Sequence, residues 1–169
     1  NLAEWGVVSG GIELSDDFGG NTVSVASGNT ISITAAQTGA LAIDANDTAA
    51  AAVTISLGAA ADDLVIGDFA AATINTGTDD ATMVDLSANA AGTSDNDVDV
   101  TIAGTAALSI TGVVETADLT IGGNTDITFG STIDTDGVLD VSGSGAVTAA
   151  GAVDAENDIS ITGDSVTLS

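Results

Sequence analysis

Short apolar-x-apolar triplets recur along nearly the whole sequence, and they constrain the fold more than any other feature. Each triplet alternates with a period of two, which is the pattern of a strand with one buried face. Gly, Asn and Asp fall between the triplets, and these residues favour turns. The triplets occupy residues 23–25, 31–33, 41–43, 53–55, 64–66, 100–102, 108–110, 119–121, 127–129, 139–141, 147–149, 159–161 and 166–168.

The triplets of the C-terminal half follow a longer period. Leu119, Leu139 and Ile159 are spaced by 20 residues, and one unit earlier the step from Val100 to Leu119 is 19. The same step of 20 relates Ile121, Val141 and Ile161, relates Gly123, Gly143 and Gly163, and carries Ile127 to Val147 and Ile133 to Val153. Each unit therefore holds two strands and a third, weaker one. The N-terminal half has the same ingredients at less regular spacing.

A repeat of about 20 residues predicts an all-β chain folded as a right-handed parallel β-helix, a β-solenoid whose equivalent residues stack about 4.8 Å apart. Gly123 and its equivalents then mark a corner where the backbone needs a positive φ or a tight turn. We expect one domain over residues 1–169, with a protruding loop at 87–97. An antiparallel β-sandwich is the alternative, because many short strands also suit that class.

The C-terminal units at residues 118–129 and 158–168 resemble the coils of filamentous-haemagglutinin-like β-solenoid adhesins. The acidic composition, with Asp62-Asp63-Leu64 and the Thr-Gly-Thr-Asp-Asp run at 76–80, is similar to that of secreted, calcium-dependent surface-layer and biofilm-matrix fibre proteins. The resemblance covers about half of the chain. It implies a secreted structural or adhesive role and transfers no catalytic residue.

Charge restricts the partners of this chain. It contains 25 Asp or Glu residues and no Lys, Arg or His, so it lacks the side chains that bind nucleic-acid phosphates or anionic lipid. No apolar run reaches the roughly 18 residues of a membrane span, which predicts no membrane insertion. The sequence begins with Asn1 and shows no basic, apolar leader, so we expect a processed polypeptide or a fragment located outside the cell.

The composition also argues against an enzyme. Without His, Cys, Lys, Arg or Tyr, the chain has no Ser-His nucleophile, no lysine Schiff base, no guanidinium clamp and no His-based metal site. Carboxylate chemistry of the glycosidase kind is the remaining route. Aromatic residues that hold sugars amount to only 2%, so we expect no catalytic residue.

Acidic residues cluster at corners and loops, where carboxylate and carbonyl oxygens are the ligands that Ca²⁺ prefers. The candidate metal ligands are Asp16, Asp17, Asp62, Asp63, Asp79, Asp80, Asp95, Asp97, Asp99, Asp134, Asp136, Asp154, Glu156 and Asp158. The segment that starts at Asp95 is no EF-hand loop, because Val100 and Ala106 stand where Gly and Glu are required. For any one cluster the alternative is a solvated turn, but the unbalanced charge of the whole chain favours Ca²⁺ as a cofactor.

The centres of the triplets should point outward, and ten of the thirteen are Ser or Thr. A regular array of hydroxyl groups on a flat solenoid face resembles that of ice-binding proteins, and it also suits lateral packing or O-glycosylation. The alternative is that Ser and Thr are simply good solvent-facing strand residues. Asn46-Asp47-Thr48 is one glycosylation sequon, so a glycan or cell-surface partner is a further expectation.

The ends of the chain suggest assembly. An open solenoid end presents unpaired β edges that template pairing with another chain. We therefore expect a non-enzymatic extracellular subunit that stacks head-to-tail into a homopolymeric filament or surface lattice. A segment at residues 1–8 with the only Trp would anchor in a neighbour or cap the first coil. The alternatives are an adhesin or binding-module fragment and an ice-binding solenoid. The expected assembly residues are Leu2, Trp5, Val7, Val8, Val166 and Leu168.

Overall fold

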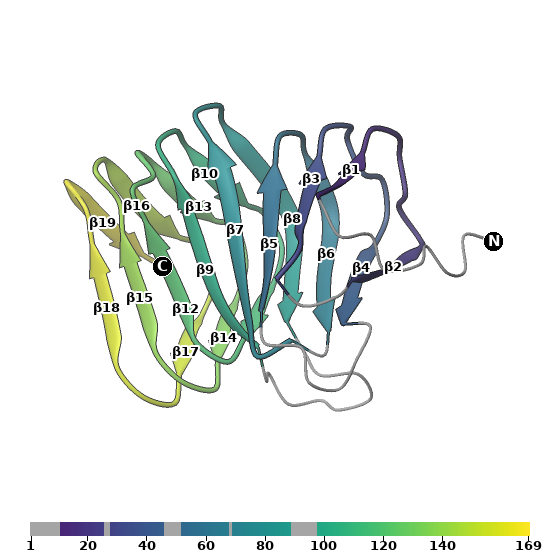
Figure 1. Ribbon diagram of the computed structural model, residues 1–169. Coiled ribbons are helices and arrows are strands. Elements are labelled where there is room, and N and C mark those ends of the chain that lie inside the picture. Colours follow the sequence, from purple (N-terminus) through teal and green to yellow (C-terminus); the bar gives the residue numbers. More distant parts are fainter. Residues whose placement is uncertain (1–10, 26–27, 46–51, 68, 89–97) are drawn as a thin grey trace.

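The chain folds as a stack of β coils without a helix in the part that the computed structural model describes, which is residues 11–25, 28–45, 52–67, 69–88 and 98–169 (Figure 1). The strands are β1 (Ile12–Leu14), β2 (Thr22–Val25), β3 (Thr30–Ile33), β4 (Leu41–Ala45), β5 (Ala52–Leu57), β6 (Ala61–Gly67), β7 (Ala71–Gly77), β8 (Ala81–Ala88), β9 (Asp99–Gly104), β10 (Leu108–Ile110), β11 (Val114–Thr116), β12 (Leu119–Gly122), β13 (Ile127–Phe129), β14 (Ile133–Thr135), β15 (Leu139–Ser142), β16 (Ala146–Ala149), β17 (Val153–Ala155), β18 (Ile159–Thr162) and β19 (Ser165–Leu168).

Each strand pairs in parallel with its equivalent one coil away. One sheet of eight strands runs β1-β3-β5-β7-β9-β12-β15-β18, and the remaining eleven strands form a second sheet. Because every strand pair in the described residues is parallel and joins successive coils, the β-solenoid prediction is confirmed and the antiparallel sandwich is wrong.

The predicted register is confirmed as well. Leu119 pairs with Leu139 and Leu139 with Ile159, so the 20-residue step is one coil. In the N-terminal half the step varies, because Ile31 pairs with Ile55 and Ile74 pairs with Ile102. Those steps of 24 and 28 residues contain extra residues between strands, which conceal the repeat in the sequence.

The alternation of the triplets places one apolar row of every strand inside the stack. Leu119, Ile121, Ile127 and Val141 are at most 1% exposed and belong to one continuous core. Ile159 points to the same side, but it is 50% exposed because β18 belongs to the last coil. Burial of equivalent residues against each other, coil after coil, is therefore the main stabilising interaction.

The cross-section of the stack changes along its length, which the sequence did not predict. The first four coils contain two strands each, whereas β9 onward there are three for every full coil. The long strand β8 makes the transition: Ala81–Met83 pair with β10, and Leu86 and Ser87 pair with β11. Between these two pairings the backbone turns at Thr111 and Gly112, whose N–H groups donate to the carbonyls of Met83 and Val84.

Two local expectations need correction. The loop predicted at 87–97 begins too early, because Ser87 and Ala88 belong to β8 and Ala88 is fully buried; residues 89–97 lie outside the described part. Among the three predicted corner glycines, only Gly123 has a positive φ, of 85°. Gly143 and Gly163 are instead close to a neighbouring coil, where a Cβ would lie 3.0 Å from Thr125 O and 2.8 Å from Gly145 O.

Two buried threonines offer a test of the core. Thr116 and Thr135 stack in register between β11 and β14, and both Oγ1 atoms are buried without a hydrogen-bond partner. Replacing either one with the isosteric Val should raise the free energy of unfolding by about 1 kcal/mol, because an unpaired buried hydroxyl is removed. Chemical denaturation measures the change, with the exposed Thr128→Val as the control that should change little. A loss of stability in both core variants would mean that the hydroxyls are bonded.

Candidate functional site

Most corner carboxylates with a visible partner connect successive coils. Asp85, Asp118 and Asp126 each precede a buried strand position, and each accepts the N–H of a residue in the next coil. The donors are Val113 at 2.5 Å, Val138 at 2.6 Å and Ala146 at 2.8 Å. Asp80 accepts the N–H of Ala107 in the same way at 3.3 Å. We call the first three contacts the Asp clasps, and their role is to satisfy a corner N–H with a charged acceptor.

A glycine precedes each N–H that an Asp clasp receives. The glycines are Gly112, Gly137 and Gly145, and in each case a Cβ would collide with Oδ1 of the clasping Asp85, Asp118 or Asp126. The carboxylate therefore occupies the space of the missing side chain. Sequence reasoning missed these three Asp residues, although Asp118 and Asp126 each have a glycine 19 residues later.

Asp17 is a further bridging carboxylate, located in the turn between β1 and β2. It accepts hydrogen bonds from the N–H groups of Gly19 and Thr38, both at 2.9 Å, and from the Thr38 hydroxyl. The Thr38 hydroxyl, followed by the two N–H groups, lowers the pKa of the Asp17 carboxyl below 3.8.

The Asp17 bonds predict a defined pH dependence. Folding favours the ionised carboxylate, so this stabilisation is complete above the unfolded-state pKa of about 3.9 and is lost as the pH falls through the lower folded value. An NMR titration should give a midpoint below 3.8 for Asp17, and Thr38→Val should raise it. A midpoint that stays the same in the variant would contradict the role of the hydroxyl.

The candidate calcium ligands do not converge on one centre in the described residues, which hold no group of three or more acidic side chains arranged for a metal ion. Asp17 and Asp80 bind backbone N–H groups instead, as described above. Asp16, Asp79, Asp136, Glu156 and Asp158 lie exposed in turns, Asp99 is the exposed first residue of β9, and Asp62 and Asp63 belong to β6. Asp95 and Asp97 lie outside the described residues.

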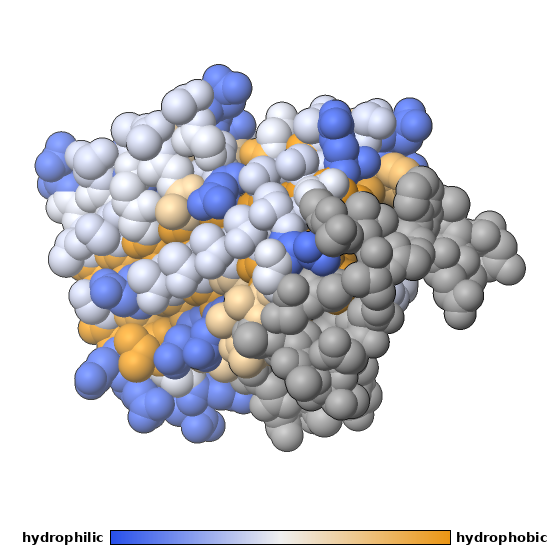
Figure 2. Space-filling view, in the orientation of Figure 1, coloured by the Kyte–Doolittle hydropathy of each residue, from blue (hydrophilic) through white to orange (hydrophobic). Residues whose placement is uncertain are grey.

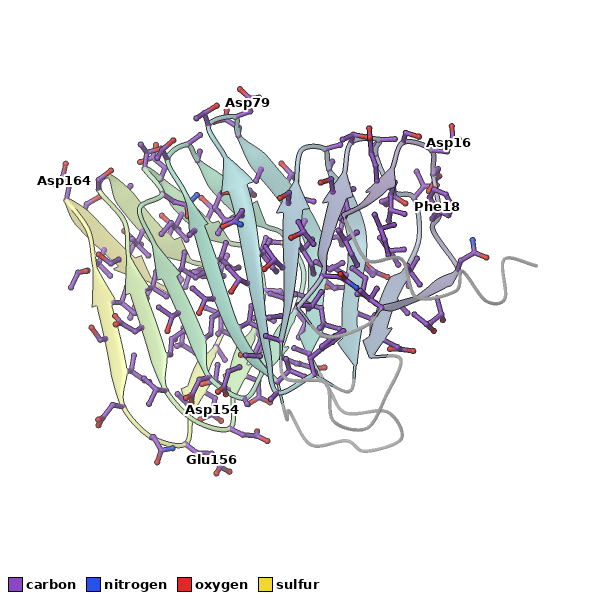
Figure 3. The ribbon with its side chains drawn as sticks, in the orientation of Figure 1. Asp16, Phe18, Asp79, Asp154, Glu156 and Asp164 are labelled. Carbon is purple, nitrogen blue, oxygen red and sulfur yellow. The ribbon has the colours of Figure 1, made fainter. Side chains whose placement is uncertain are left out.

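Asp134 and Asp154 do come together, in a row that we call the acidic ladder. Glu115 of β11, Asp134 of β14 and Asp154 of β17 stand in register on successive coils. Neighbouring strands are about 4.8 Å apart, so like charges lie directly opposite each other, which destabilises the pairing unless counter-ions screen it. Figure 3 shows Asp154 and Glu156 at the lower edge of the last coils.

The eight-stranded sheet has a different outer surface. A row of five threonines, which we call the threonine ladder, runs without interruption through Thr30, Thr54, Thr73, Thr101 and Thr120. The parallel row two residues later holds Ser32, Ser56 and Asn75 on the first three of these strands. Neither row carries a charge between β3 and β12, so this face is the uncharged one in a strongly acidic molecule. It faces the viewer in Figure 2 as pale rows.

A cleft of about 300 Å³ lies between two neighbouring corners. One side is the turn after β5 at Leu57–Ala59, and the other is the taller crest between β7 and β8, which carries Asp79 at its tip (Figure 3). The crest is taller because Ser56 pairs with Asn75 while Ala61 pairs with Met83, which leaves three extra residues in the later turn. Asp79 and Asp80 are the ionisable residues of its lining, and no catalytic pairing follows from them.

The most unusual apolar surface is the last coil. Ile159 of β18 and Val166 and Leu168 of β19 are 50%, 43% and 55% exposed, although the equivalent residues of the preceding coil are buried. We call these three residues the open coil. Figure 2 shows apolar surface next to hydrophilic residues at this end of the stack, on the left of the view. Val166 and Leu168 were expected at an assembly surface, whereas Leu2, Trp5, Val7 and Val8 lie outside the described residues.

Two searches complete the description of the site. No helix in the described residues is long and apolar enough to cross a membrane. Comparison with known protein families, with curated proteins and with solved structures finds no match for this chain.

Proposed function

We propose that this chain is a non-enzymatic, extracellular structural subunit that self-assembles through its end coils into a filament or a surface lattice. The open coil is the observation that carries the proposal. Three large apolar side chains at the end of a regular stack stay about half exposed, and soluble proteins rarely leave such a patch uncovered.

The backbone at this end supports the same proposal. Within the described residues, β17, β18 and β19 each pair on one side only, with β14, β15 and β16. An exposed β edge beside an apolar face is a template for another β strand. A further β coil, supplied by a second copy of the chain, satisfies both the edge and the apolar residues.

Calcium enters the proposal as a counter-ion. The acidic ladder brings carboxylates together without any cationic side chain in the sequence to balance them, and divalent ions bind carboxylate oxygens. A melting curve in Ca²⁺ and in chelator measures this contribution, and the Asp134→Asn variant should lose part of the calcium response.

The threonine ladder favours one second candidate, an ice-binding face. Its hydroxyl groups repeat at the strand spacing of about 4.8 Å along the stack and about 6.6 Å along each strand, which forms a regular, uncharged array. Inhibition of ice-crystal growth by the purified chain tests this candidate. Thr101→Glu should abolish the effect, while Thr128→Glu on another face should not.

Self-association of the purified chain tests the main proposal. Sedimentation velocity and negative-stain images in high salt should show species larger than the 16.1 kDa monomer, because salt screens the charge of the subunits. Particles that remain monomeric across concentration and salt would reject it.

A further inference from the structure

The two ends of the stack differ, and the difference bears on how two copies meet. In the first coil, Leu14 and Val25 are 3% and 1% exposed, whereas Ile159 and Leu168 in the last coil are about half exposed. The first coil contains two strands, β1 and β2, while the other end presents three terminal strands on three faces. The C-terminal end therefore matches itself in shape and apolar character better than it matches the first coil.

The terminal strands β17, β18 and β19 form a rising edge. They follow each other along the chain, and each covers a strand of the preceding coil on its own face. The chain climbs one strand spacing, about 4.8 Å, for every full coil, so β17 ends lower than β18, and β19 ends higher. The next place above β17 is open, because the described chain ends with β19.

A twofold axis that crosses the stack at β18 matches this edge to itself. The rotation places β18 beside β18 of a second copy, exchanges the faces of β17 and β19, and reverses the strand direction. The rise of the coil then brings β19 of the partner subunit one strand spacing above β17, in the open place. All three terminal strands obtain an antiparallel partner at the normal distance.

We propose that two copies of this chain dock tail-to-tail through their C-terminal coils, with β18 paired antiparallel to β18 and β19 paired to β17 of the other copy. The inference rests on the proposed function and names the contact that it uses. A head-to-tail contact would meet the two-stranded first coil and leave β17 without a partner. The resulting dimer is a closed, isologous unit that keeps both N-terminal coils outward for further assembly.

The register follows from the side chains. Inward residues must stay inward across the contact, so Ile159 lies opposite Ile161 of the partner subunit, and Ser160 lies opposite Ser160 of the partner subunit. Val166 and Leu168 in turn meet Ala155 and Val153 of the partner subunit. Every residue of the open coil is then covered by an apolar side chain.

Charge makes this contact dependent on salt. Asp164 lies in the turn between β18 and β19, and Glu156 and Asp158 lie in the turn before β18. Reversal of β18 brings Asp164 of one copy toward Glu156 and Asp158 of the other, and no cationic side chain is present to pair them. High salt shortens the screening length to about 3 Å at 1 M, so the dimer should form at lower protein concentration as NaCl is raised.

Single cysteine variants test the geometry, because the chain contains no Cys. In the proposed dimer the two Ser160 Cα atoms are about 4.5–5.5 Å apart, within the range that a disulfide requires. Ser160→Cys should therefore oxidise to a covalent dimer in 1 M NaCl. Thr101→Cys, exposed on the same sheet in the middle of the stack, should stay monomeric on a non-reducing gel. Light scattering of both variants under reducing conditions gives the mass of the assembly.

Each outcome decides between the arrangements. A mass of two chains with the Ser160→Cys cross-link supports the tail-to-tail contact. Open-ended polymers without the cross-link would overturn it and leave the proposed function standing. A dimer that does not cross-link would overturn the β18 pairing. Monomers at every salt concentration would overturn the proposed function together with the inference.

Discussion

Ile159→Asp is expected to hold the chain in its monomeric form and to weaken self-association by more than about 100-fold. The side chain is 50% exposed in the single chain, so the added carboxylate remains solvated there and folding changes little. In the assembly the same carboxylate would be buried against apolar residues, which costs several kcal/mol when no cation pairs it. Sedimentation velocity in 1 M NaCl measures the effect.

Thr128→Asp is the matched control for this prediction. It adds the same charge at an exposed, outward position of β13, two coils before the end. It should assemble like the unmodified chain. Equal association of Ile159→Asp and Thr128→Asp would mean that the open coil takes no part in the contact.

Gly137→Ala is expected to lower the free energy of unfolding by about 2 kcal/mol. The new Cβ would occupy the position of Asp118 Oδ1, so the carboxylate must leave the Val138 N–H that it accepts at 2.6 Å. The loss combines local overpacking with a broken charge-assisted hydrogen bond. Chemical denaturation of the monomer at low protein concentration measures it.

Two further variants separate the steric cost from other effects. A Cβ on Gly122 would meet nothing within 4 Å, so Gly122→Ala should be neutral or slightly stabilising. In the Asp118→Ala background the collision is absent, and Gly137→Ala should cost much less there. Additive effects of the two substitutions would contradict the Asp clasp.

The sequence predicted the fold best where the coil length is constant. The step of 20 residues from Leu119 to Leu139 identified one coil because no insertion interrupts it. Between Ile74 and Ile102 an extra stretch lies between strands, so the same pairing was not visible as a repeat. The change from two to three strands per coil was not predictable, since it depends on β8 pairing with β10 and β11 at once.

The roles of the carboxylates were harder to predict than the fold. Acidic residues at corners indicated calcium ligands, but Asp80 instead accepts a backbone N–H from the next coil. That contact depends on which corner stacks above it, which the residues near Asp80 in the sequence do not specify. The exposed end was predicted more closely: Val166 and Leu168 were expected at an assembly surface and are among the most exposed large apolar residues.

The mass of the unmodified chain in 1 M NaCl tests the central claim most directly, because self-assembly through the open coil is what the proposed function requires. Sedimentation equilibrium over a range of protein concentrations should give a mass that rises from 16.1 kDa to at least twice that value. The transition should move to higher concentration as the salt is removed. A mass that stays at 16.1 kDa under all of these conditions would contradict the account.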